Sequence, residues 1–205
     1  MQLGNVMNNK TPRELLNQFY IDNHLGADGG NASSSVKIEM NRYFYFYIPN
    51  FDARRKAVIK HDIHHLLTGY TTELKGESEI SAWEIASGCK KYRAAFFINL
   101  SGFMISFWIN FRGALKAFSR GRKTKNLYYD EFSTEEALDM TIDELRVLMR
   151  LDQYPKEVKP SFTDVLLFLA FTLFGGLYSL LLMVLLPFII LYSITITLGQ
   201  RKQKV

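Results

Sequence analysis

Residues 165–198, VLLFLAFTLFGGLYSLLLMVLLPFIILYSITITL, contain no charged side chain. A run of about 18 or more uncharged, mostly apolar residues is typical of a membrane segment, because a helix of that length crosses the hydrocarbon core of a bilayer. The rest of the 205-residue chain is far more polar. The sequence therefore predicts a folded domain over residues 1–160 and a hydrophobic membrane-anchoring tail over residues 161–205.

The uncharged stretch is too long for one straight perpendicular span. Its 34 residues would form a helix of about 51 Å, whereas the hydrocarbon core is about 30 Å thick. Gly175-Gly176 and Pro187 are natural places for a bend. A single span over residues 177–198 would place the basic residues 201–204 across the membrane from the domain, which the positive-inside rule disfavours. We therefore favour a hairpin, with the single span as the alternative.

Charge and cysteine content indicate where the domain lies. The N-terminus, MQLGNVMNNK, has no apolar core like that of a secretory signal, so we expect residues 1–160 to fold on the cytoplasmic face before the tail emerges. The single cysteine, Cys89, excludes an intramolecular disulfide. Short basic clusters, such as residues 120–125, lie in a chain of net charge +5 without any motif for binding RNA or DNA. We expect them to contact anionic lipid, and we expect no nucleic-acid partner.

Capping motifs predict that the domain is all-α, a single helical domain. Asp52 is a suitable N-cap for a helix that ends at Gly69, and a second helix is expected from about Glu77 to Ser87. The aromatic stretch 40–51 is consistent with a strand or with an irregular segment. Three capping boxes open further helices: Thr11-Pro12-Arg13-Glu14, Ser133-x-x-Glu136 and Thr141-x-x-Glu144.

Residues 94–111, AAFFINLSGFMISFWINF, form a second uncharged stretch. Asn99, Gly102, Ser106 and Asn110 recur at steps of three and four, which gives a weakly polar stripe along a helix. This stripe favours a buried core helix over a membrane span. In an alternative interpretation, the small Gly102 and Ser106 leave room for an isoprenoid tail in an apolar groove.

The segment His61-Asp62-Ile63-His64-His65 contains three of the four histidines in the chain. His61 and His65 share one face of a helix and can bind the same cation. The side chain of Asp62 is turned by about 100° around the helix from that of His61, but it can reach the edge of this site. Glu77, at the start of the next helix, can point at it. These four residues would bind a divalent metal, Zn²⁺ with Fe²⁺, Mn²⁺ or Co²⁺ as alternatives, and leave a position open. A pair of unconnected surface histidines is the other interpretation.

Residues 61–77, HDIHHLLTGYTTELKGE, fit HDxxH followed by eleven residues and a glutamate. With the LTGY turn and the later basic GRKTKN before a short leucine-rich helix, this ordered set resembles the coenzyme Q biosynthesis protein 4 family from about residue 44 to residue 152. The resemblance implies a helical fold, a metal bound by His61, Asp62, His65 and Glu77, and work on polyprenylated quinone precursors at a membrane. His64 stands where we expect a neutral residue, and the apolar tail lies outside the common domain.

The resemblance further implies a metal-dependent lyase of ubiquinone biosynthesis. Such an enzyme removes the ring carboxylate of a polyprenyl hydroxybenzoate, with a hydroxyl replacing it in an oxidative version. We assign catalysis to Glu77 and His64. His64, or one of the acids Glu73, Glu79 and Glu84, would move the proton. His64 could instead be an extra ligand or a solvent-facing side chain.

Two other functions remain open on the sequence alone. A non-catalytic scaffold would bind quinone-type lipid and organise other quinone-biosynthesis enzymes, with a closed, structural metal site. An HD-type phosphohydrolase would need His24, which lies at a helix end before a flexible loop and is poorly placed for a ligand. As partners we expect the membrane, a prenylated aromatic lipid and a second copy of the chain in a homo-oligomer.

Overall fold

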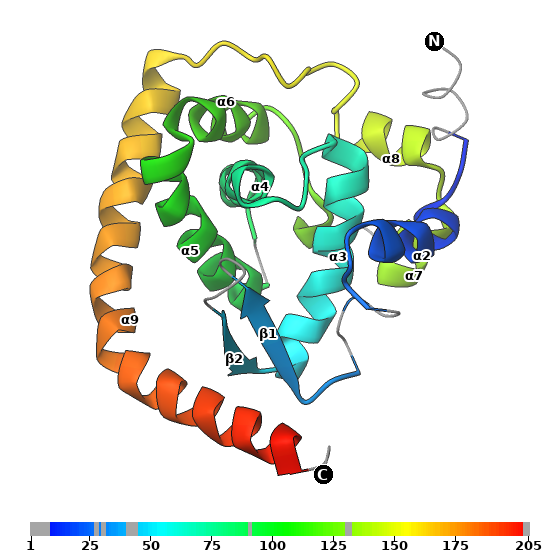
Figure 1. The fold of residues 1–205 in the computed structure, drawn as a ribbon. Coiled ribbons are helices and arrows are strands. Elements are labelled where there is room, and N and C mark those ends of the chain that lie inside the picture. The colour runs from blue at the N-terminus through cyan, green and yellow to red at the C-terminus, as the bar shows by residue number, and fades with distance from the viewer. Residues whose placement is uncertain are drawn as a thin grey trace.

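Helices make up most of the protein in the computed structural model, which describes residues 9–26, 29, 32–39, 45–89, 92–129 and 133–202. The all-α prediction is confirmed, with the addition of a short antiparallel hairpin in which Val36 pairs with Ile48. The elements, labelled as in Figure 1, are α2 (Pro12–Asp22), β1 (Ser35–Glu39), β2 (Tyr45–Pro49), α3 (Asp52–Thr68), α4 (Leu74–Ser87), α5 (Arg93–Ile109), α6 (Phe111–Gly121), η1 (Leu127–Tyr129), α7 (Thr134–Asp139), α8 (Ile142–Leu148) and α9 (Phe162–Lys202).

Local sequence explains where most helices begin and end. The three capping boxes form as predicted at the starts of α2, α7 and α8. Helix α3 ends at Gly69, whose φ of 70° lies in the left-handed region that glycine adopts without strain. Its N-cap is Phe51 and not Asp52, which is the first helical residue. Helix α4 begins at Leu74, three residues before the predicted start. The aromatic stretch contains strand β2, while residues 40–44 lie outside the described ranges.

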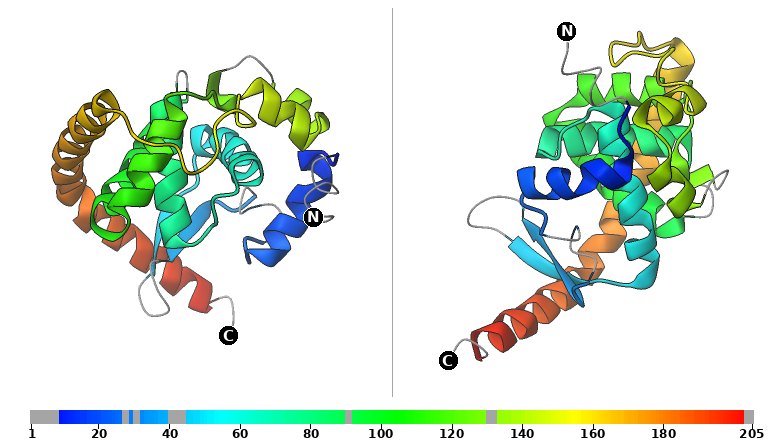
Figure 2. Two further views of the ribbon diagram at one scale, coloured as in Figure 1. Left: turned by 90° about the horizontal axis from the view of Figure 1, so that it is seen from above. Right: turned by 90° about the vertical axis from the view of Figure 1, so that its right-hand side faces the viewer.

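Helix α4 runs through the centre of the domain, with α3, α5 and α6 around it (Figures 1 and 2). Ile80 and Trp83 are fully buried, and so is the charged Glu84 on the same helix. A helix buried on all sides has no continuous polar face, so any charged residue on it needs partners from its neighbours. This central position brings the acidic residues of α4 against the histidines of α3.

Helix α5, which contains most of the second uncharged stretch, is buried on one side only. Asn99, Leu100 and Phe103 face the core and are at most 3% exposed. Phe97 is 43% exposed and Trp108 is 81% exposed. The prediction of a core helix is therefore confirmed for the polar stripe and the residues beside it, whereas the opposite side carries exposed aromatic rings.

The first turns of α9 belong to the core of the domain. Phe168 is fully buried, and its ring centroid lies 4.8 Å from that of Phe103 and 5.6 Å from that of Phe118. Arg122 Nη1 donates a 2.8 Å hydrogen bond to Asp164 Oδ1, which fixes the start of the helix. Helix α9 then follows the outside of α5 towards β2 (Figures 1 and 2).

The hairpin predicted for the tail is wrong. Helix α9 continues without a break through Gly175, Gly176 and Pro187 to Lys202, and Figure 1 shows a bend between its orange and red portions but no reversal. Proline removes one helical hydrogen bond and bends a helix, but it need not end it. Gly175 packs closely on Met104, where a larger residue would collide with that side chain. The segment Phe162–Gly199 is the one described helix long and apolar enough to cross a membrane, so it could anchor the protein there.

Replacing Phe168 with alanine should destabilise the domain by about 3–5 kcal/mol, because a fully buried ring would leave a cavity among other aromatic rings. The matched control is Phe188→Ala, since Phe188 lies on the same helix and is 67% exposed. Thermal unfolding of the detergent-solubilised protein, followed by circular dichroism, should show a lower Tm for the first variant only. Equal shifts for both variants would show that α9 is not part of the core.

Candidate metal centre

The turn between α3 and α4 positions the candidate site. Gly69 ends α3 in a left-handed conformation, and the chain turns back through residues 70–73 into α4. Gly76 lies so close to the backbone of Thr71 that any side chain would collide with it. This close approach fixes the first turn of α4 against the end of α3, so that Glu77 faces the histidines of α3.

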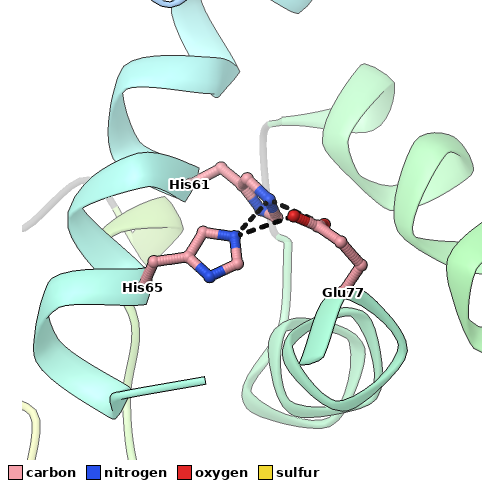
Figure 3. A group of neighbouring side chains, drawn as sticks. All are labelled: His61, His65 and Glu77. Carbon is pink, nitrogen blue, oxygen red and sulfur yellow. Dashed lines mark hydrogen bonds and ion pairs between the residues drawn. The ribbon is translucent and has the colours of Figure 1, made fainter. Parts of the chain in front are cut away.

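His61 and His65 on α3 and Glu77 on α4 point towards one another (Figure 3). The two Nε2 atoms are 3.1 Å apart. Glu77 Oε2 lies 3.4 Å from His61 Nε2, and Glu77 Oε1 lies 3.2 Å from His65 Nε2. One ligand atom from each residue falls within 4.8 Å of the others, which is a spacing that a single metal ion can bridge.

Hydrogen bonds at the far nitrogens determine which tautomer each histidine adopts. His65 Nδ1 lies 2.9 Å from the carbonyl oxygen of Tyr70, which can only accept, so Nδ1 carries the proton. His61 Nδ1 lies 3.0 Å from the carboxylate of Glu84 and donates to it in the same way. Both Nε2 atoms are therefore free to act as ligands. A carboxylate or carbonyl behind each imidazole is the usual support for a metal-binding histidine.

The residues present fit a divalent metal. Two unprotonated Nε2 atoms at 3.1 Å would repel each other, so a positive charge belongs between them. Burial lowers the pKa of His61, but the carboxylates of Glu84 and Glu77 raise it well above its usual value, so a proton fills this place when no metal is bound. Burial alone would raise the pKa of Glu77, but hydrogen bonds from His61 and His65 lower it to about 2, so its carboxylate is ionised. Two imidazoles and one carboxylate match the three-ligand sets of catalytic zinc sites. The Glu77 side chain is 38% exposed, so the site opens to solvent on that side.

Asp62 lies outside the group of ligand atoms, contrary to the prediction that it is a fourth ligand. Its Oδ2 accepts a 3.0 Å hydrogen bond from Tyr20 Oη of α2. Burial raises the pKa of Asp62 to about 6. Because adjacent helical residues are turned by about 100°, Asp62 faces α2 while His61 faces α4.

His64 is neither solvent-facing nor free to move a proton. Its side chain is fully buried, and its Nδ1 donates to Glu84 Oε1 at 2.5 Å. Its Nε2 accepts a 2.9 Å hydrogen bond from the backbone N–H of Leu127. Burial lowers the pKa of His64, which keeps the ring neutral. With both nitrogens occupied, His64 holds Glu84 in place, and the catalytic role predicted for it does not fit this geometry.

Glu84 joins the candidate metal centre to the core, whereas from the sequence we expected it only as one of the acids that could move the proton. It is fully buried and accepts hydrogen bonds from His61, His64 and Asn99, with Tyr128 Oη 3.5 Å away. Burial raises the pKa of Glu84, but the positive charge of His61 and the hydrogen bonds from His61 and His64 lower it by more, to well below its usual range. Glu84 follows Glu77 by seven residues, two helical turns, and this spacing could have placed both acids on one face.

The other predicted candidates lie elsewhere. His24 is exposed beyond the end of α2, and the ligand group does not include it, which removes the geometric basis for an HD-type phosphohydrolase. Glu73 is exposed at the start of α4. Glu79 accepts a 2.9 Å hydrogen bond from Asn110 Nδ2 at the end of α5.

No family model matches this chain, and neither the curated proteins nor the solved structures contain a match to it.

Proposed function

We propose that His61, His65 and Glu77 bind one divalent metal, with Zn²⁺ as the best fit, and that the protein is a metal-dependent lyase acting at a membrane. The observation that carries this proposal is the pair of Nε2 atoms turned towards one carboxylate while both Nδ1 atoms are engaged behind them. Metal-binding histidines almost always donate their other ring N–H to a carboxylate or a carbonyl, and both of these histidines do so.

The substrate that we propose is a polyprenylated hydroxybenzoate, which fits an open metal centre in a protein that carries a long apolar helix. A metal bound at this centre would supply Lewis-acid stabilisation of the ring carboxylate or phenolate oxygen. The Nε2 atoms of His61 and His65 lie side by side, 3.1 Å apart, and Glu84 orients the His61 ring through its Nδ1. As the carbon–carbon bond breaks, CO₂ leaves and the ring carbon takes up a proton from the solvent-exposed side near Glu77, because His64 is sealed in the core.

We further propose that α9 spans the membrane and that the remaining domain lies on its cytoplasmic face, as a member of the coenzyme Q biosynthesis protein 4 family would. The exposed apolar residues of α9, such as Leu177, Leu180 and Val184, support membrane insertion. A homo-oligomer and contacts with other quinone-biosynthesis enzymes belong to the same proposal.

Glu77→Gln should abolish turnover of a ring-carboxylated prenyl precursor while leaving the protein folded, because the amide keeps the shape but loses the charge that binds the metal. Product is measured by liquid chromatography after loading the purified protein with Zn²⁺, Fe²⁺, Mn²⁺ or Co²⁺. Glu73→Gln is the matched control, since Glu73 is exposed and lies on the adjacent turn.

Wild-type protein that holds a metal but leaves the carboxylate in place with every metal would overturn the lyase. In that case a metal-stabilised, lipid-binding scaffold would be the better assignment. Full turnover by Glu77→Gln would overturn the role of this carboxylate.

A further inference from the structure

A cavity lies between the start of α4, the start of α6 and the connection from α8 to α9. It encloses about 270 Å³. Figure 1 shows this connection passing across the α6 end of the molecule. None of His61, His65 and Glu77 lines it, so it is distinct from the candidate metal centre.

The side chains around this cavity carry more positive than negative charge. Four cations line it, Lys75, Arg112, Lys116 and Lys156, against the two carboxylates Glu79 and Glu157. Both carboxylates already have partners, since Lys116 pairs with Glu157 and Asn110 donates to Glu79. Within the described residues, the side chains of Lys75 and Arg112 have no ion pair or hydrogen bond.

Tyr70 provides an independent indication of a ligand. It lines the cavity, is 6% exposed, and its buried hydroxyl has no hydrogen-bond partner in the described part of the chain. Buried hydroxyls are normally paired, because leaving one unsatisfied is unfavourable. A tyrosine hydroxyl donates a hydrogen bond, so an anion in the cavity would satisfy it.

A buried cation lies behind Tyr70. Arg120 is 2% exposed, and its guanidinium carbon is 5.8 Å from the centroid of the Tyr70 ring. Arg120 donates to the carbonyl oxygens of Tyr154 and Thr68, at 2.8 and 3.2 Å, and it has no carboxylate partner among the described residues. A buried charge without a counter-ion raises the local potential and favours an anion nearby.

Exposed apolar residues adjoin the cavity at the junction of α5 and α6. The cavity is lined there by Asn110 and Arg112. Their neighbours along the chain are apolar and partly exposed, Ile109 at 47% and Phe111 at 37%. Trp108, at 81%, precedes them. A tryptophan and apolar neighbours beside cationic groups are characteristic of the membrane interface, where lipid phosphates meet acyl chains.

We infer that this cavity binds a phosphate group, and that its source is an anionic membrane lipid whose acyl chains lie along Trp108, Ile109 and Phe111. Arg112 and Lys75 provide the free charges, and the Tyr70 hydroxyl donates a hydrogen bond to a phosphate oxygen. This inference does not depend on the metal centre or on the proposed reaction.

The test uses the full chain in detergent micelles, with native mass spectrometry to measure the affinity of each probe. The probes are dihexanoyl phosphatidic acid, dihexanoyl phosphatidylcholine and inorganic phosphate. We expect phosphatidic acid to bind tightest, phosphatidylcholine to bind weakly and inorganic phosphate to compete. Arg112→Gln and Lys75→Gln should each weaken phosphatidic acid binding by roughly tenfold, because each removes one charge-assisted contact.

Two further variants separate binding from folding. Lys56→Gln removes a charge from an exposed lysine of α3 and should leave binding unchanged. Tyr70→Phe should weaken binding without lowering Tm, because the hydroxyl has no partner to lose within the described chain. Equal affinity for phosphatidic acid in wild type, Arg112→Gln and Lys75→Gln would overturn the site, as would the absence of binding by every probe. Binding of inorganic phosphate but not of phosphatidic acid would overturn the lipid source.

Discussion

His65→Ala should leave the purified protein without its metal, whereas wild type should carry about one divalent ion per chain. His65 supplies one of only two nitrogen ligands, and its Nε2 lies within 3.2 Å of both His61 Nε2 and Glu77. With an alanine there, one imidazole and one carboxylate remain, too few to bind the metal through purification. Element analysis by inductively coupled plasma mass spectrometry, on protein without a histidine tag, gives the stoichiometry.

The control for this experiment is His24→Asn, because His24 is exposed and its φ of 55° is tolerated by asparagine. This variant should keep the full metal content. His61→Ala should behave like His65→Ala, since its Nε2 occupies the equivalent position. A wild-type protein that takes up no metal, even when metal is supplied, would refute the metal centre.

Glu84→Gln should raise the dissociation constant of the metal by about 10–100-fold, the usual effect of losing a carboxylate behind a metal-binding histidine. The amide keeps the volume of the buried side chain and one acceptor oxygen, but it removes the charge that orients His61 and holds a proton on its Nδ1, which leaves Nε2 to the metal. Competition with a chelator measures the constant. Glu73→Gln, at the exposed residue just before the same helix, should leave it unchanged.

Glu84→Ala should affect both metal binding and stability, because it removes the acceptor that His61, His64 and Asn99 share. Truncating one partner of a buried charged network typically destabilises a protein by about 3–5 kcal/mol. We therefore expect weak metal binding together with a lowered Tm, whereas Glu84→Gln should affect mainly the metal. Wild-type metal affinity in Glu84→Gln would show that His61 is oriented without this carboxylate.

Local signals predicted the helices well, because a cap or a left-handed glycine acts within a few residues. The capping boxes at Thr11, Ser133 and Thr141 and the end of α3 at Gly69 are examples. The hairpin in the tail was predicted from the same kind of local signal, a glycine pair and a proline. It failed because these residues permit a bend without requiring a reversal: Gly175 packs on Met104 of α5 within a continuous helix, and Pro187 lies inside that helix.

The candidate site was predictable only in part, because helical spacing gives the face of a residue but not its partner. The four-residue step brought His61 and His65 together, and the spacing to Glu77 followed from the turn. Spacing could not show that Tyr20 donates a hydrogen bond to Asp62, since α2 lies about 40 residues earlier in the chain. Nor could it show that the backbone N–H of Leu127, in η1, donates a hydrogen bond to His64 Nε2.

The place of Phe168 in the core has a consequence for the order of events during synthesis. Of the described core residues, Phe168 lies furthest along the chain, so the core closes only after the start of α9 has left the ribosome. From the sequence we expected the domain to be complete at residue 160. Its core instead includes Phe168, eight residues later. Since chains grow from the N-terminus at about 5–20 residues per second, the apolar part of α9 emerges within seconds of its first turns. With α9 inserted in a membrane, as we propose, docking of those turns onto the domain and capture of the same helix by lipid would be competing steps in the maturation of this protein.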